Sequence, residues 1–245
     1  MQGDPRHDPD IVSQQISELL AQPTTTHGLA RALRAALKEL DVHRTHTAAL
    51  KAWPDGRIDD MPRKVQIGGG AHRIDDYFNI DAVPPADLLW DVREGIPLHD
   101  NTVHDLFSEH FLEHIDYPNS AKHYAREAHR VIAPGGRVVT GVPDAGFVLS
   151  RYPSGDADTR TMLKKWYGKR DCHDHINTHL DLINYVFRDQ DDDPVYHPHY
   201  WAYDHDKLVQ LFIEAGFTTV EPWEFDPTIA NPKREWASVY VVATK

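Results

Sequence analysis

The chain has 245 residues, and its hydrophobic content of 40% suits one folded globule with a sizeable core. It carries 26 Lys and Arg against 38 Asp and Glu, a net charge of −12. This balance argues against a nucleic-acid partner, because such partners require basic residues to neutralise phosphates. No apolar run is long enough to span a bilayer, and the N-terminus is too acidic and polar for a signal peptide. We therefore expect a cytoplasmic protein with neither a nucleic-acid nor a membrane partner.

The single cysteine, Cys172, excludes an internal disulfide framework and any multi-cysteine metal site. The 17 histidines stand out more, because histidine is the side chain that changes charge between pH 5 and 8. Histidine is also the commonest acid or base in catalysis, so the histidine clusters are the first place to look for chemistry.

The N-terminal quarter of the chain predicts helices. Apolar residues recur at helical spacing over 11–21 and again over 29–40. We expect residues 1–60 to form a helical extension ahead of a main domain over 61–245. The extension would cover the edge of the core; a lid over the active site and a contact between two copies in a homodimer are the alternatives.

The rest of the chain predicts strands and helices in βαβ order. Strands are expected at 64–67, 77–81, 88–91, 103–108, 136–142, 217–225 and 237–244, and helices at 120–132, 161–167, 180–187 and 205–215. Gly216 follows the last helix, where a left-handed residue is wanted. This order predicts an α/β fold, a Rossmann-like doubly wound sheet that is mostly parallel, with helices on both faces.

Two motifs indicate a family. Leu112-Glu113-His114-Ile115, followed by HRVIAPGG over residues 129–136, resembles the branch of class I S-adenosylmethionine-dependent methyltransferases that carries LEH and RVLKPGG-like motifs. The resemblance covers 64–144 well and 204–245 more loosely. It implies a last strand antiparallel beside the sixth, a substrate-region insertion at about 145–203, and S-adenosylmethionine as the cofactor. It also implies that the Glu113-His114 pair and the Pro-Gly-Gly turn are scaffold.

The end of the first strand and the end of the second predict cofactor contacts. Gly68, Gly69 and Gly70 let the backbone approach a ligand, although a tight turn is an equally simple explanation. Asp81 can accept hydrogen bonds from both hydroxyls of a ribose, as acids also do in nicotinamide enzymes. Asp81 follows Gly70 by only eleven positions and no third glycine of a G-x-G-x-x-G turn appears, so a helix to hold a pyrophosphate has no room. The spacing disfavours NAD.

The resemblance implies further cofactor contacts after the third and fourth strands. Asp91 and Val92 would lie near the adenine, although a turn before a glycine also explains the aspartate. Ser108, Glu109 and His110 would hold the methionine part through their backbone or through the Glu109 carboxylate.

Methyl transfer from a sulfonium is an in-line displacement, and a hydroxyl acceptor benefits from a nearby base. The candidate catalytic residues are His173, His175 and His179, in the polar stretch expected to cap the acceptor pocket. A solvated loop is the alternative for each of them. A divalent-metal site built from these histidines and the neighbouring aspartates is a less favoured alternative, because the spacing matches no compact ligand motif, and we predict no metal ligand.

A second histidine cluster lies further along, at His197 and His199. Behind it, Tyr203 could line the acceptor pocket and Asp204 could cap the following helix. The sequence thus predicts a methyltransferase acting on a small molecule, with a hydroxyl of a sugar or secondary metabolite as acceptor. A small amine acceptor, a non-catalytic cofactor-binding protein and, last, an NAD-linked oxidoreductase are the alternatives.

Overall fold

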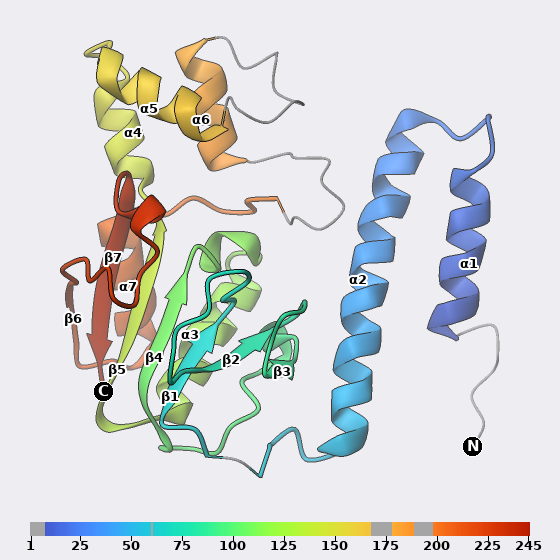
Figure 1. Ribbon diagram of the computed structural model, residues 1–245, viewed down its shortest axis with the longest axis horizontal. Helices are drawn as coiled ribbons and strands as arrows, with labels where there is room; N and C mark the ends of the chain where they lie inside the picture. Colours follow the sequence, from blue (N-terminus) through green and yellow to red (C-terminus); the bar gives the residue numbers. More distant parts are fainter. Residues whose placement is uncertain (1–7, 60, 168–177, 189–197) are drawn as a thin grey trace.

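The computed structural model describes residues 8–59, 61–167, 178–188 and 198–245. One sheet of seven strands forms its centre, in the order β3-β2-β1-β4-β5-β7-β6 (Figure 1). The strands are β1 Lys64–Ile67, β2 Phe78–Asp81, β3 Leu88–Leu89, β4 Val103–Glu109, β5 Ile132–Pro143, β6 Thr219–Pro222 and β7 Ser238–Thr244. The first five run parallel, and β7 is antiparallel to both of its neighbours, β5 and β6. The predicted α/β sheet, with an antiparallel last strand beside the sixth, is confirmed.

The Pro-Gly-Gly turn differs in detail from the expectation. Instead of a reversal before the strand, β5 already begins at Ile132, which pairs with Val103. The next pair joins Asp105 to Arg137, so the turn is an excursion within β5. Gly135 has φ +77, which supplies the left-handed residue that this excursion needs.

Two helices precede the sheet, as predicted. Helix α1 spans Pro9–Leu20, and α2 spans His27–Ala52, beyond the expected end near residue 40. Arg44 of α2 binds the Ser13 hydroxyl at 2.8 Å and thereby joins the two helices. Helix α2 also packs on the β3 edge of the sheet, where the rings of His46 and Trp90 lie 4.4 Å apart. Among the described residues, no helix combines the length and the apolar character needed to cross a membrane.

One face of the sheet is covered by helices α3 (Asn119–Val131) and α7 (His205–Ala215), which also contact each other. Asp204 caps α7 by accepting a hydrogen bond from the Lys207 amide at 2.8 Å, and Gly216 ends it at φ +111, as expected for both. The core beneath the two helices includes Val65, Ile67, Leu106, Tyr124, Ala128, Val138, Leu208, Phe212 and Val241.

The other face differs from the expectation of helices on both sides. Phe107 and Val139 alternate with the residues of the first core and point to this second face. They pack against Ile74 and Tyr77 from the β1–β2 connection and against Ala230 from the β6–β7 loop. Residues 68–77 are too short a connection for a covering helix, and none is assigned there. Two apolar loops close this face.

Three helices stand above the end of β5: α4 Ala145–Arg151, α5 Ala157–Tyr167 and α6 His179–Phe187 (Figure 1). Helices α5 and α6 were predicted from the sequence, and α4 was not. Asp144 caps α4 by accepting a hydrogen bond from the Phe147 amide at 3.0 Å. The three helices share a small core of their own, formed by Val148, Leu163, Leu182 and Val186. The division into domains at residue 60 and the insertion over 145–203 stay predictions.

Replacement of Gly141 tests the packing of β7 on β5. A Cβ at Gly141 would lie 2.1 Å from Cε1 of Tyr240, its partner in the ladder. Gly141→Ala should therefore lower the free energy of unfolding in urea by about 1–3 kcal/mol. Gly28→Ala is the control, because a Cβ on this helical glycine meets nothing within 4 Å and should leave stability unchanged or slightly raised. Equal stability of the two variants would contradict this packing.

Candidate functional site

The chain order of the sheet reverses between β1 and β4. In open α/β sheets, ligands bind outside the carboxyl ends of the strands at such a point. Gly68 follows β1 there with φ +66, and Phe111 lies just beyond β4. A Cβ at Gly68 would lie 2.8 Å from Cδ2 of Phe111, so packing alone requires glycine at this position. The two loops thus lie against each other at the point where the chain order reverses.

Asp81 lies at the carboxyl end of β2, where the sequence predicted it. The Gly70 amide donates to Asp81 Oδ2 at 3.0 Å, and the Val83 amide donates to Oδ1 at 3.2 Å. The Gly69 amide likewise donates to the Asn79 side chain at 3.1 Å. A Cβ at Gly70 would meet nothing within 4 Å, so there is open space on that side of the residue. The glycine loop thus holds the carboxylate at the carboxyl end of β2.

Asp91 caps η2 (Val92–Glu94) at the end of β3, but its charge is already matched. Arg93 binds both carboxylate oxygens of Asp91 at 2.8–3.0 Å and also binds Glu39 of α2. These two acids raise the pKa of Arg93 above its ordinary value. The Val92 side chain is buried in the main core. Contact of Asp91 and Val92 with an adenine stays a prediction.

A cavity of about 800 Å³ opens beside Asp91. Glu39, Leu40 and His43 of α2 form one wall, and Arg93 and neighbouring residues form another. Its volume lies within the usual range for small-molecule sites. Helix α2 thus covers the sheet edge and also walls a cavity next to the predicted cofactor residues.

Ser108 and Glu109, at the end of β4, are both buried. The Ser108 hydroxyl shares a hydrogen bond of 3.0 Å with Thr140 on β5. The Glu109 carboxylate accepts hydrogen bonds from the Tyr240 hydroxyl at 2.6 Å and from Arg234 at 3.3 Å. Its charge is therefore used to hold β7 and η4 (Pro232–Arg234). Contact of Ser108 or Glu109 with a cofactor stays a prediction.

His110 and Glu113 form a buried acid–imidazole pair after β4. His110 has φ +51, its Nε2 lies 2.8 Å from the Ser238 hydroxyl, and its Nδ1 lies 3.6 Å from Glu113 Oε1. Burial, with a smaller effect of Arg234, holds the pKa of His110 well below its ordinary value. Glu113 is 2% exposed on η3 (Leu112–His114), and burial raises its pKa to about 8. A contact of His110 with a cofactor likewise stays a prediction.

His114 and His199 complete this cluster. The resemblance implied a scaffold role for His114, and His199 belonged to the second histidine cluster, but neither was among the predicted catalytic residues. The rings of His114 and His199 lie 4.9 Å apart at 66°. His199 is 5% exposed, and its Nδ1 donates to the Val186 carbonyl of α6 at 2.7 Å. Tyr203 is buried near Glu113, whose charge adds to the effect of burial in raising the tyrosine pKa. The acid and imidazole within LEH were the available signal, but nothing local connects them to His199.

Of the three predicted catalytic histidines, only His179 lies among the described residues. His173 and His175 lie outside the described residues. His179 is the first residue of α6, and its ring lies edge-on to Tyr152 at 5.1 Å. Its Nε2 is buried without a hydrogen-bond partner among the described residues. The catalytic role of all three stays a prediction.

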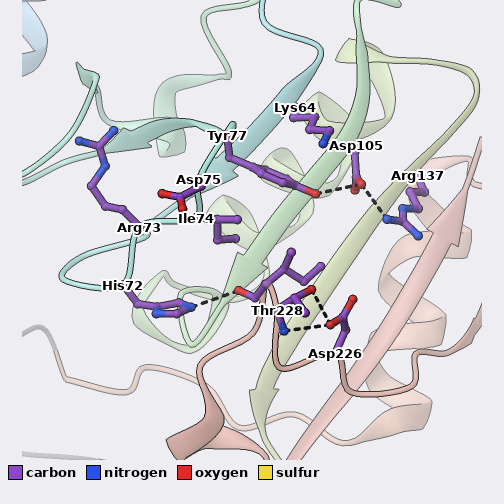
Figure 2. A pocket seen from close by; sticks show the side chains of 11 residues that line it. Lys64, His72, Arg73, Ile74, Asp75, Tyr77, Asp105, Arg137, Asp226 and Thr228 are labelled. Carbon is purple, nitrogen blue, oxygen red and sulfur yellow. Dashed lines mark hydrogen bonds and ion pairs between the residues drawn. The ribbon is translucent and has the colours of Figure 1, made fainter.

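A second, smaller cavity of about 330 Å³ lies toward the opposite ends of the strands (Figure 2). It is lined by Lys64 of β1, Asp105 of β4 and Arg137 of β5, which are partners in neighbouring strands. Asp105 accepts hydrogen bonds from Tyr77 at 2.9 Å and from Arg137 at 2.7 Å, so these polar groups are paired with one another. Its position makes it a poorer candidate for a ligand site than the carboxyl ends of the strands.

No family model matches the chain, and no curated protein matches it in sequence. Solved structures to which it is similar include three S-adenosylmethionine-dependent methyltransferases. The one from Thermotoga maritima is 16% identical over 83% of this chain and 91% of that chain, with a TM-score of 0.43. Those from Methanosarcina mazei (14% identical, 78% and 96% covered, TM-score 0.44) and Mesorhizobium loti (16%, 81% and 96%, 0.39) are comparable. At these identities the similarity concerns the fold alone.

The raised pKa of Glu113 predicts a pH-dependent stability. The folded chain keeps the Glu113 proton up to about pH 8, whereas the unfolded chain releases it near pH 4.5. The protonated Glu113 therefore contributes its full share to the free energy of unfolding below about pH 4.5. This contribution is lost as the pH rises to about 8, by at most about 1.4 kcal/mol per pH unit.

Glu113→Gln should remove the contribution of this group to the pH dependence of the free energy of unfolding. Urea unfolding at several pH values between 5 and 8, in EDTA to keep divalent ions away, measures the difference between the two proteins. The variant should gain stability relative to the wild type as the pH rises. Parallel pH profiles would show that the folded protein holds Glu113 ionised.

Proposed function

We propose that the protein transfers a methyl group from S-adenosylmethionine to a hydroxyl of a small molecule. The observation that carries this proposal is Asp81, held at the end of β2 by the Gly70 amide beside the point where the chain order reverses. A carboxylate fixed there can accept hydrogen bonds from both hydroxyls of a ribose.

The short β1–β2 connection favours this cofactor over a dinucleotide. A dinucleotide site uses the N-terminus of the helix that follows the glycine turn to bind the pyrophosphate. Residues 68–77 contain no helix, so that device is missing. S-adenosylmethionine carries no phosphate, so its binding does not require a helix N-terminus at this place.

The remaining parts of the cofactor then have candidate neighbours. The adenine would lie toward Asp91 and Val92, beside the cavity walled by α2. The methionine part would lie by the backbone of Ser108, Glu109 and His110. We favour the backbone over the Glu109 carboxylate, because Tyr240 and Arg234 already bind that group.

The acceptor would enter from the side of α4, α5 and α6, which stand above the end of β5 (Figure 1). In this proposal the protein holds the acceptor oxygen, the methyl carbon and the sulfur in line, which supplies much of the acceleration. A histidine of the set His173, His175 and His179 takes the hydroxyl proton as the oxygen attacks. S-adenosylmethionine would supply the methyl group with its sulfonium sulfur as the leaving group, so the products would be the methylated acceptor and S-adenosylhomocysteine. A sugar or a secondary metabolite is the acceptor class we propose.

The cofactor assignment is tested by calorimetry on Asp81→Asn. The amide keeps one oxygen for the backbone but loses the charge that would bind the ribose hydroxyls. We expect S-adenosylmethionine to bind about 10-fold or more weaker. Asp75 is an exposed acid in the connection between β1 and β2, and the Asp75→Asn variant should bind S-adenosylmethionine as the wild type does. Unchanged affinity in Asp81→Asn, or binding of NAD in place of S-adenosylmethionine, would contradict the assignment.

The base is tested with an acceptor identified by release of S-adenosylhomocysteine. His179→Gln should lower kcat by about 100-fold or more while leaving cofactor affinity unchanged. The exposed His99→Gln serves as the control and should retain full turnover. Full turnover in His179→Gln would remove His179 from the catalytic set and leave His173 and His175 to be replaced in the same way.

A further inference from the structure

The geometry points to a binding site for one zinc ion, formed by Glu113, His114 and His199. One ligand atom from each side chain lies within 4.8 Å of the other two. Glu113 and His114 are neighbours on η3, and the Tyr200 amide donates to the Glu113 carbonyl at 2.7 Å, which brings the His199 segment to them. No local pattern in the sequence predicts this site, because the third ligand comes from a distant segment.

The burial of Glu113 is the second and independent observation. Its side chain is 2% exposed, and neither carboxylate oxygen has a hydrogen-bond partner among the described residues. The nearest imidazole nitrogens, of His110 and His114, lie 3.6 and 3.9 Å from Oε1, beyond hydrogen-bonding distance. A buried carboxylate in such surroundings is costly unless a cation or a hydrogen-bond donor reaches it. A metal ion between these groups would supply that cation.

His199 is oriented as metal-bound histidines usually are. Its Nδ1 donates to the Val186 carbonyl at 2.7 Å, which leaves the lone pair of the neutral ring on Nε2. In metal sites the second ring nitrogen typically makes this kind of bond to a carbonyl or carboxylate, which fixes the tautomer and the ring direction. Because Val186 belongs to α6, the site would also connect η3 to the three helices above the sheet.

The donor set selects the ion. Two imidazoles and one carboxylate suit Zn²⁺ and related transition metals, whereas Mg²⁺ and Ca²⁺ prefer oxygen ligands throughout. Zinc bonds of about 2.0–2.2 Å place ligand atoms roughly 3.3 Å apart, so separations that now reach up to 4.8 Å would shorten by up to about 1.5 Å on binding. Three protein ligands leave the fourth zinc position open for water or for an oxygen ligand.

The test measures zinc directly and needs no turnover. The protein is stripped with EDTA, reloaded with Zn²⁺, passed over a desalting column and analysed for metal per chain; a competing chelator dye gives the affinity. We expect one zinc per wild-type chain, and more than about 100-fold weaker binding in Glu113→Gln and His199→Gln. His46→Gln replaces a histidine at Trp90, outside the cluster, and should bind zinc as the wild type does.

Cobalt provides a measurement on the unaltered protein. Co²⁺ bound in place of zinc should give the visible absorption of a low-coordinate site with nitrogen ligands, and zinc should displace it. Circular dichroism shows whether the variants are folded. The proposal is overturned if the wild type retains no zinc, if folded Glu113→Gln and His199→Gln retain as much as His46→Gln, or if bound Co²⁺ keeps the spectrum of the hydrated ion.

Discussion

The hydrogen bonds of the Glu109 carboxylate are the interactions on which the carboxyl end of β4 and its surroundings depend. Glu109 is 4% exposed, and its carboxylate joins the end of β4 to Tyr240 on β7 and to Asn231 and Arg234 in the loop before β7. A buried charge is tolerated only when its partners are in place, so this group dictates where the returning chain must lie. The same loop carries the apolar residues that close the second face of the sheet.

This anchoring also holds the loops at the carboxyl ends of the strands. With β4 held from the β7 side, the residues after it are fixed against the glycine loop, where Phe111 meets Gly68. The loop in turn holds Asp81 through the Gly70 amide. Preorganised groups of this kind lose little freedom when a ligand binds, which is why we locate cofactor binding here rather than at the smaller cavity of Figure 2.

Much of the fold could be predicted because its signals are local. Short apolar segments marked the strands, Gly216 marked the end of α7, and the order of elements predicted the sheet. Helix α4 was missed because it has only seven residues, too few for a clear helical period. The loop cover of the second face could not be read either, since Ile74 and Ala230 meet there only through tertiary packing.

The candidate site divides in the same way. Asp81 could be located because it ends the second predicted strand, and parallel strands bring their carboxyl ends to one edge of the sheet. The resemblance implied that Glu113 and His114 are scaffold. The burial of Glu113 and its proximity to His199 depend on the tertiary structure, so the sequence alone could not predict them. The partners of Glu109 were hidden for the same reason, because Arg234 and Tyr240 lie far along the chain.

A crystal structure with S-adenosylhomocysteine shows whether Asp81 binds the ribose of the cofactor. We expect the ligand outside the carboxyl ends of β1, β2 and β4, with both ribose hydroxyls on the Asp81 carboxylate and the adenine toward Asp91. A ligand seated elsewhere, with Asp81 still bound only to the protein, would rule out this cofactor site.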